Sequence, residues 1–284
     1  MLRSKKISPE KAATHNRSVN GSLIAYKDRE LEMAVLFEVE EGIATLTLNR
    51  PEVLNAMDVA TYAEISDVLK EIEANDDILV GIVTGAGEKA FSAGADLKHM
   101  HLGLPNDEEW KPWRPTRWDF GLSTTKPLVA AINGYALAGG LELAMICDIR
   151  IASLNAQFGT PEVKWNLLHG YGSFKLPRIV GLTSAMEMLL TGEFINAEEA
   201  LRIGLISHIY PFNQLMTEAR RLAERIRDNG PMAVRMTKEL VQYGLTNSLE
   251  NHFRIMHEYY DRVDRTSDQK ERLSDFAQER RQES

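Results

Sequence analysis

Two unbroken apolar runs strongly limit what this chain can fold into. The runs are "ILVGIVTGAG" and "KPLVAAING", and each reads as a strand that is covered on both faces, as in a parallel sheet. Just before the first run, "DVATYAEISDVLKEIEAND" has apolar residues three and four positions apart and Asp58 as its N-cap, which predicts a helix. Strands that alternate with helices in this way indicate an α/β fold.

The alternation extends over the chain to about residue 210. The segment "VLFEVEEGIATLTLNRP" predicts a hairpin that turns at Glu41 and Gly42, and "DIRIAS" and "AQFGTPE" predict further strands. The remainder is helical, because amphipathic spacing recurs in "NQLMTEARRLAERIRD", "PMAVRMTKELVQYGL" and "SLENHFRIMHEYYDRV". We expect these helices to form either a packing cap or an oligomerisation element.

Composition excludes several classes of protein. With 33 basic and 41 acidic side chains the net charge is -8, which argues against nucleic acid or an anionic membrane as the main partner. The single cysteine, Cys147, excludes a disulfide framework and a multi-cysteine metal cluster, so a reducing compartment is expected. No apolar stretch reaches the ~20 residues that a membrane helix needs. We therefore expect a cytoplasmic protein.

The first residues, 1–34, differ in character from the rest of the chain. They are basic at the start and lack the apolar segment of a secretory signal. We expect a flexible N-terminal extension, since chain ends are commonly disordered. An organelle transit segment is the alternative, and it would move the protein to an organelle matrix.

Two sequence patterns that could indicate a nucleotide or metal site are weak. The stretch "TGAGEKA", Thr84 to Ala90, matches a dinucleotide-binding pattern, but it leads into more small residues rather than directly into a helix. A tight turn explains it. His99 and His101 are two residues apart, a spacing that would place them on different faces of a helix. With no HExxH or comparable set, no metal site is expected.

Two other segments have the features of a reactive site. "AFSAGADLKHM" and "ALAGGLELAM" each follow an apolar strand and end in a small-residue turn that opens a helix. Backbone N–H groups at such a turn have no partner within the helix, and the helix dipole adds positive charge there. Together the two turns can direct two amides at one oxygen, which is an oxyanion hole. The alternative is that Gly139 and Gly140 only ease packing.

Two acidic residues stand close to these turns. Glu142 follows Gly139 by three residues, so on a helix it lies on the same side as the Gly139 amide. Glu162 follows a strand and a turn at Pro161. Two carboxylates that meet beside an oxyanion hole can divide the roles of acid and base. The alternative for Glu142 is compensation of the helix dipole, worth about 0.3 to 1 kcal/mol.

These segments resemble the crotonase superfamily, and most of all its enoyl-CoA hydratase branch. The similarity runs from about Leu36 to the end of the chain, in the family's order, through "LTLNRPEVLNAM", "FSAGADLKHM", "KPLVAAINGYALAGGLELAMICDIRIAS", "FGTPE" and "LTGEFINAEEALRIGLI". The resemblance implies a crotonase-type spiral of repeated ββα turns over residues 35–230, which contains an acyl-CoA site. A C-terminal helical trimerisation region over residues 231–284 is implied to follow.

The resemblance also implies a chemistry. The amides of Ala95 and Gly139 match the positions that hold the thioester carbonyl oxygen of an acyl-CoA. Glu142 matches the residue that acts mainly as base toward a water, and Glu162 matches the residue that delivers a proton to the α-carbon. The two amides would stabilise the enolate-like charge of the hydration reaction. No metal or redox cofactor is implied, because coenzyme A is part of the substrate.

Further positions match the coenzyme A groove and the subunit interface of the family. Lys98 matches a residue that often contacts the phosphate or adenine end of coenzyme A, and Leu54 and Ala56 belong to a segment that lines the same groove. The backbone near Ala93 approaches the nucleotide in relatives. Relatives form trimers, commonly paired into hexamers, so a homotrimer or hexamer is expected, with residues from 231 onward between subunits.

The loop after Glu162 departs from the family pattern. Hydratases usually carry a proline and small residues there, whereas this chain has His169 in place of the proline and Tyr171 in place of a small residue. The loop borders the acyl pocket in relatives, so both residues are candidates for substrate binding. His169 can hydrogen-bond substrate or join Glu162 in acid–base chemistry. The more common role of such a residue is that of a partly buried structural histidine.

A second departure is the aromatic loop "EEWKPWRPTRWDF", which contains Trp110, Trp113, Trp118 and Phe120. In relatives this segment borders the acyl chain, so the loop, and Trp118 in particular, predicts a pocket for a bulky or aromatic acyl group. Packing of these tryptophans against a neighbouring subunit is the alternative.

Hydration of a 2-enoyl-CoA is therefore the leading hypothesis, and other functions compete with it. A double-bond isomerase on the same scaffold needs only one acid, so the presence of both acids favours the hydratase. Hydrolytic cleavage of an acyl-CoA has only His169 in its favour. Some relatives bind RNA, which the acidic balance disfavours, and a role as a pure assembly subunit is disfavoured by the intact pair of acids.

Overall fold

The computed structural model describes residues 33–97 and 124–282. By its contacts the chain divides between Met33 and Ala34, and every element given below belongs to the second unit, residues 34–284. None of the described helices is both long and apolar enough to cross a membrane. Lys98 and the aromatic loop with Trp118 lie outside the described residues, so the predictions made for them stay predictions.

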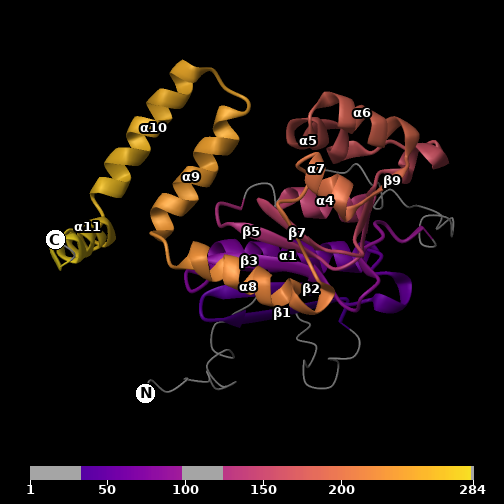
Figure 1. Cartoon of the computed structure of the whole chain (residues 1–284), viewed down its shortest axis with the longest axis horizontal. Helices are drawn as coiled ribbons and strands as arrows, with labels where there is room; N and C mark the ends of the chain where they lie inside the picture. The colour runs from indigo at the N-terminus through magenta and orange to yellow at the C-terminus, as the bar shows by residue number, and fades with distance from the viewer. Residues whose placement is uncertain (1–32, 98–123, 283–284) are drawn as a thin grey trace, which may run out of the picture. The chain divides into compact units, whose positions relative to one another are not determined.

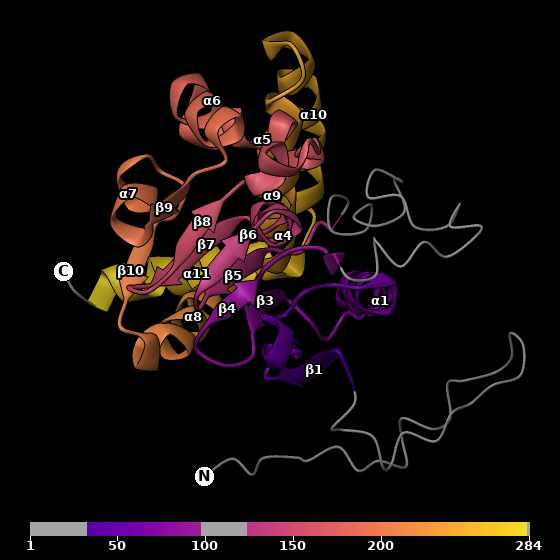
Figure 2. The same cartoon turned by 90° about the vertical axis from the view of Figure 1, so that its right-hand side faces the viewer.

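The larger sheet has six strands in the order β1-β2-β3-β5-β7-β10, of which Figure 1 labels the first five and Figure 2 labels β10. The β1 and β2 strands form the predicted hairpin, and the other neighbouring strands pair in parallel. At the hairpin turn, Glu41 and Gly42 have φ angles of 51° and 79°, the pair of left-handed residues that a type I′ turn requires. In sheet order the strands are Val35–Glu40, Ile43–Leu48, Val80–Gly85, Leu128–Ile132, Ile149–Ser153 and His208–Tyr210.

The smaller sheet has four strands in the order β4-β6-β8-β9. Figure 2 shows β4, β6 and β8 side by side, and they pair in parallel, whereas β9 is antiparallel to β8. Because parallel strands end at the same edge of a sheet, the segments that follow β4, β6 and β8 meet there. The bounds are Ala90–Ser92 for β4, Tyr135–Leu137 for β6, Gln157–Gly159 for β8 and Phe194–Asn196 for β9.

The helices begin where the sequence provides a cap or a turn. Asp58 is the N-cap of α1 as predicted, since its Oδ1 atom accepts a hydrogen bond of 2.9 Å from Thr61 N. The three amphipathic segments predicted after residue 210 form α8, α9 and α10, and α11 lies in the remaining C-terminal part, which was also expected to be helical. The bounds are Pro51–Val53 (η2), Val59–Ala74 (α1), Gly139–Ile146 (α4), Pro161–Trp165 (η4), Gly170–Val180 (α5), Leu182–Thr191 (α6), Ala197–Arg202 (α7), Phe212–Arg227 (α8), Pro231–Gly244 (α9), Leu249–Asp264 (α10) and Ser267–Gln282 (α11).

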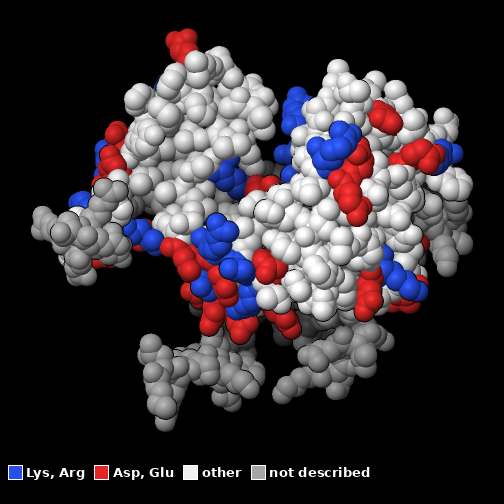
Figure 3. All heavy atoms as spheres, in the orientation of Figure 1, with Lys and Arg blue, Asp and Glu red and all other residues white. Residues whose placement is uncertain are grey.

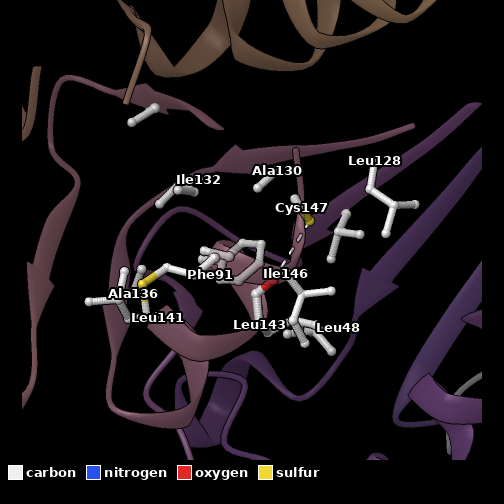
Figure 4. Packing of buried hydrophobic residues seen from close by; sticks show 14 of the residues in the cluster. Leu48, Phe91, Leu128, Ala130, Ile132, Ala136, Leu141, Leu143, Ile146 and Cys147 are labelled. Carbon is white, nitrogen blue, oxygen red and sulfur yellow. Dashed lines mark hydrogen bonds between the residues drawn. The ribbon is translucent and has the colours of Figure 1, made fainter. Parts of the chain in front are cut away.

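Buried side chains hold the two sheets and the helices together. One face of the six-stranded sheet packs against α8 through a cluster that includes Ile82, Ile151 and Leu215. The main cluster joins α1, α4 and both sheets, and Figure 4 shows part of it, with Phe91 of β4 among residues of α4. All eight residues of α4 are buried. An acid on this helix is therefore held in a fixed apolar setting.

Candidate active site

Two backbone amides lie close together where β4 and β6 end. A Cβ atom added to Gly94 would lie 2.9 Å from Gly139 N, and one added to Gly139 would lie 3.7 Å from Ala95 N. Both chain segments take left-handed φ angles here, 92° at Gly94 and 51° at Ala138, which lets the two backbones approach. Such an approach requires small residues, which explains the composition of both turns.

Within the part of the chain that the structure describes, the fold leaves both amides without a hydrogen-bond acceptor. Met57 N donates to Gly94 O (2.8 Å) and Asp96 N donates to Met57 O (2.9 Å), so Ala95, between them, turns its own N–H to the opposite side. Across the described residues, neither Ala95 N nor Gly139 N donates a hydrogen bond. Two neighbouring N–H groups without partners, one of them at the N-terminus of α4, are suited to bind an oxygen that gains negative charge.

An ion-pair network that sequence reasoning missed fixes the Ala95 segment. The Arg50 guanidinium contacts Asp96 Oδ2 at 3.2 Å and Asp58 Oδ2 at 3.1 Å, and it donates to Ala56 O at 2.8 Å. Through these contacts the planar Arg50 guanidinium holds three parts together. They are the start of α1, the segment that pairs with Ala95 through Met57, and the residue after Ala95. The only sequence signal was charge placed inside two otherwise apolar motifs, "LNRP" and "GADL".

The positions predicted for the coenzyme A groove lie next to one another, except for Lys98, which is not described. Ala93 N donates to Leu54 O at 3.0 Å, which joins the segment after β4 to the turn after η2. Leu54 and Asn55 both have left-handed φ angles, and the Asn55 amide donates to Ala90 O at 2.7 Å, which holds the turn in place. Ala56 is buried, whereas Leu54 and Ala93 are partly exposed.

The two glutamates come from different elements and meet at one histidine. Glu142 lies on the first turn of α4 and Glu162 on the first turn of η4. His169 Nδ1 lies 3.2 Å from Glu142 Oε1 and 3.1 Å from Glu162 Oε1. Glu142 Oε1 also accepts a hydrogen bond of 2.9 Å from Tyr171 N, the second amide of α5. The structure thus brings both predicted acids together with His169 and Tyr171, the two residues at which the loop after Glu162 departs from the family pattern.

The cluster is buried, which strengthens its electrostatics. The exposed fractions of the side chains are 2% for His169, 7% for Glu142 and 14% for Glu162. Burial by itself lowers the pKa of His169, but the carboxylates of Glu142 and Glu162 outweigh it and raise that pKa to about 9. The imidazole is therefore a cation near neutral pH. Both contacts to Nδ1 lie within ion-pair distance, although neither has the angle of a well-directed hydrogen bond.

A glycine makes room for the imidazole ring. A Cβ atom on Gly172 would lie 2.4 Å from both Cδ2 and Nε2 of His169, so any side chain at that position would displace the ring. Within the described residues, His169 Nε2 and Glu162 Oε2 are buried and have no hydrogen-bond partner. Gly172 is a second determinant of the site that sequence reasoning missed, and its signal was the Gly-x-Gly spacing that follows His169.

Two further titratable groups near the cluster, Tyr171 and Cys147, stay neutral. Burial raises the pKa of the Tyr171 phenol to about 12 and that of the Cys147 thiol to about 12, so both stay protonated near neutral pH. Among the residues with described positions, no group of three or more His, Cys, Asp and Glu side chains is arranged to hold a metal ion. The chemistry available at the site is thus that of two carboxylates, one imidazole and two amides.

Comparison with known proteins places this chain in a family. The sequence model of the enoyl-CoA hydratase/isomerase family matches residues 38–284. The chain belongs to this family. Membership of the crotonase superfamily, predicted from the motifs, is confirmed.

Relatives and solved structures agree with that assignment. The chain is 37% identical over 257 residues to the short-chain-enoyl-CoA hydratase of Clostridium acetobutylicum, a match that covers 87% of this chain and 95% of the relative. It is 39% identical over 261 residues to the (E)-benzylidenesuccinyl-CoA hydratase of Thauera aromatica, covering 87% and 97%. The enoyl-CoA hydratase structure from Bacillus anthracis superposes with a TM-score of 0.81 at 33% identity, covering 87% and 97%. The crotonase-type α/β fold is therefore confirmed as well.

Proposed function

We propose that this chain adds water across the 2,3 double bond of an enoyl-CoA thioester, which makes it a hydro-lyase. The observation that carries the proposal is the cluster of Glu142, Glu162 and His169 at the same sheet edge as the unpartnered amides of Ala95 and Gly139. An acid, a base and an oxyanion site are the groups that this reaction requires. The relatives from Clostridium acetobutylicum and Thauera aromatica are both named as hydratases, which supports the choice.

In the proposed reaction the amides of Ala95 and Gly139 donate to the thioester carbonyl oxygen. Glu142 takes a proton from water as the water oxygen bonds to the β-carbon, and Glu162 gives a proton to the α-carbon. Water is thus divided into a hydroxyl group on one carbon and a hydrogen on the other. The carbonyl oxygen gains charge in between, and each amide stabilises it by about 3 to 4 kcal/mol. Coenzyme A enters as part of the substrate, and no separate cofactor is proposed.

Binding of the coenzyme A part is proposed for the adjacent groove formed by Leu54, Ala56 and Ala93, with Lys98 toward the phosphates. The 3.0 Å hydrogen bond from Ala93 N to Leu54 O supports the inclusion of both segments. For the acyl part, we propose a bulky or aromatic group. The support is the departure at His169 and Tyr171, together with the benzylidene group in the name of the Thauera aromatica relative.

The oligomer proposed is a homotrimer or a pair of trimers, with residues 231–284 between subunits. Exposed apolar side chains on α9 and α10 support this assembly. Figure 3 shows few charged side chains on the face of these helices that is turned to the viewer. The exposed set on the two helices and the turn between them is Met232, Val241, Leu245, Leu249, Phe253 and Tyr260. Sedimentation analysis of the wild-type protein and of a Leu245→Glu, Leu249→Glu variant tests it, with dissociation expected in the variant.

We propose that the protein works in the cytoplasm, with an organelle matrix as the alternative. The single cysteine supports a reducing compartment. The proposed partners include neither nucleic acid nor membrane. The net charge of -8 supports this, and on the face in Figure 3 acidic and basic side chains are interspersed rather than gathered into a basic patch.

The proposal is tested by hydration assays over straight-chain, branched and aromatic 2-enoyl-CoA thioesters. We expect activity with the wild-type protein and a loss of about 10²- to 10⁴-fold in both Glu142→Gln and Glu162→Gln. Glu187→Gln, at an exposed position on α6, is the matched control and should keep full activity. Full hydration rates in both site variants would overturn the proposed roles. Faster turnover of crotonyl-CoA than of aromatic thioesters would overturn the proposed acyl group.

A further inference from the structure

Hydration leaves the two glutamates in the wrong protonation states for the next turnover. In the proposed reaction Glu142 ends with the proton of the attacking water, and Glu162 ends without the proton it gave to the α-carbon. Each cycle therefore needs one proton to return from Glu142 to Glu162. Among the described residues, the side chain of His169 lies within ion-pair distance of both acids, through one nitrogen, at 3.2 Å and 3.1 Å.

We propose that His169 relays this proton between Glu142 and Glu162 through Nδ1, a role that rests on the proposed hydration. Before the addition, the imidazolium gives its Nδ1 proton to Glu162 and becomes neutral, with the remaining proton on Nε2. Glu162 then protonates the α-carbon while Glu142 takes the water proton. Glu142 finally returns that proton to Nδ1. One proton stays in the cluster throughout, and the net reaction is unchanged.

The surroundings of the ring suit a relay. Its side chain is 2% exposed, so bulk water does not compete for the Nδ1 proton. Glu142 of α4 and Glu162 of η4 face Nδ1, and the nearby Tyr171 phenol stays neutral because its pKa is raised to about 12. Gly172 lies beside the Cδ2 and Nε2 atoms of the ring, where the lack of a side chain leaves room for the imidazole.

The charge of the cluster supports the same role. The pKa of His169 is raised to about 9, so at neutral pH the ring holds the proton that the relay needs. Above that pH the cluster loses its shared proton, and the rate should fall with it. His169 acts through the two glutamates and is therefore a positioning residue rather than a group that touches the substrate.

The experiment compares His169→Gln and His169→Gly with the wild-type protein in the hydration assay, over pH 6 to 10. We expect kcat to fall about 10²-fold in both variants with little change in KM. The alkaline limb of the pH profile should move to lower pH, because a carboxyl group alone holds a proton less tightly than the imidazole. Added imidazole should restore His169→Gly at least tenfold, since Gly172 leaves space for the ring, and should leave His169→Gln unchanged.

The control is His208→Gln, an exposed histidine on β10, which should match the wild-type protein at every pH. Wild-type kcat and pH profile in His169→Gln would overturn the relay and leave the proposed hydration intact. A slow His169→Gly variant that imidazole does not restore would show that His169 is only structural, and would equally overturn the relay. An inactive wild-type protein over the whole thioester panel would instead overturn the proposed function.

Discussion

The imidazolium of His169 should make the stability of the folded protein depend on pH in a defined window. Its pKa rises from the ordinary 6.5 to about 9 in the folded chain. A group whose pKa is higher in the folded state binds its proton more tightly there, so it stabilises the fold. Each pKa unit corresponds to ~1.36 kcal/mol, and the rise of about 2.5 units gives about 3 kcal/mol.

The direction of the effect follows from the two pKa values. Below about pH 6.5 the histidine is charged in both states, and the full stabilisation is present. As the pH rises through about 9, the folded protein also loses the proton and the stabilisation disappears. Replacement of His169 by glutamine removes this dependence. The free energy of unfolding should thus fall by about 3 kcal/mol more in the wild-type protein than in His169→Gln between pH 6 and pH 10.

Urea denaturation followed by far-UV circular dichroism measures the difference. The protomer concentration is kept fixed, because assembly couples to unfolding. His208→Gln is the control and should follow the wild-type curve. A difference between the wild-type protein and His169→Gln that stays constant, within about 1 kcal/mol, from pH 6 to pH 10 would refute the reasoning. The imidazole would then be uncharged in the folded protein despite its two carboxylate neighbours.

Three further outcomes are expected. Gly139→Ala should still fold, with a modest loss of stability, because the buried Tyr62 Oη would lie 3.0 Å from the new methyl group and must move by a few tenths of an ångström. Hydration should fall about 10²- to 10³-fold as the methyl group crowds the amide site. Circular dichroism with the activity assay checks both. Lys238→Met should lower the free energy of unfolding by about 1 to 3 kcal/mol, because the Lys238 side chain, which is 7% exposed, pairs with Asp148 at 2.8 Å. Urea denaturation measures the loss, and an unchanged midpoint would contradict the prediction. Cys147, whose pKa is raised to about 12 by burial, should resist alkylation at pH 8 until the protein is unfolded, as mass spectrometry can record.

Local patterns were sufficient for most of the secondary structure. Apolar runs predicted β3 and β5, the spacing around Asp58 predicted α1, and the pair Glu41 and Gly42 predicted the hairpin turn. Each of these signals is contained within a few consecutive residues. The α11 helix lies within the C-terminal region that was expected to be helical, although its own amphipathic pattern is weak. The motifs in their order were sufficient to identify the family.

The candidate site was only partly accessible from the sequence. Glu142 and Glu162 were singled out because an acid beside a glycine turn is unusual, yet they stand 20 positions apart and nothing local indicates that they meet. The hydrogen bond from Tyr171 N to Glu142 and the space that Gly172 leaves for a ring were not predictable. Both depend on how α4 and α5 pack, which is a property of the folded chain.

Local sequence patterns were enough for most strands and helices, for the family and for the two acids and two amides of the site, because backbone preferences and apolar periodicity act over short distances. The tertiary structure decided what His169 contacts. The parallel pairing of β4, β6 and β8 brings the segments after them to one edge, and the start of α5 then holds the imidazole between the two carboxylates. Charge and burial at that point arise from residues distant in the chain, so no local pattern encodes them.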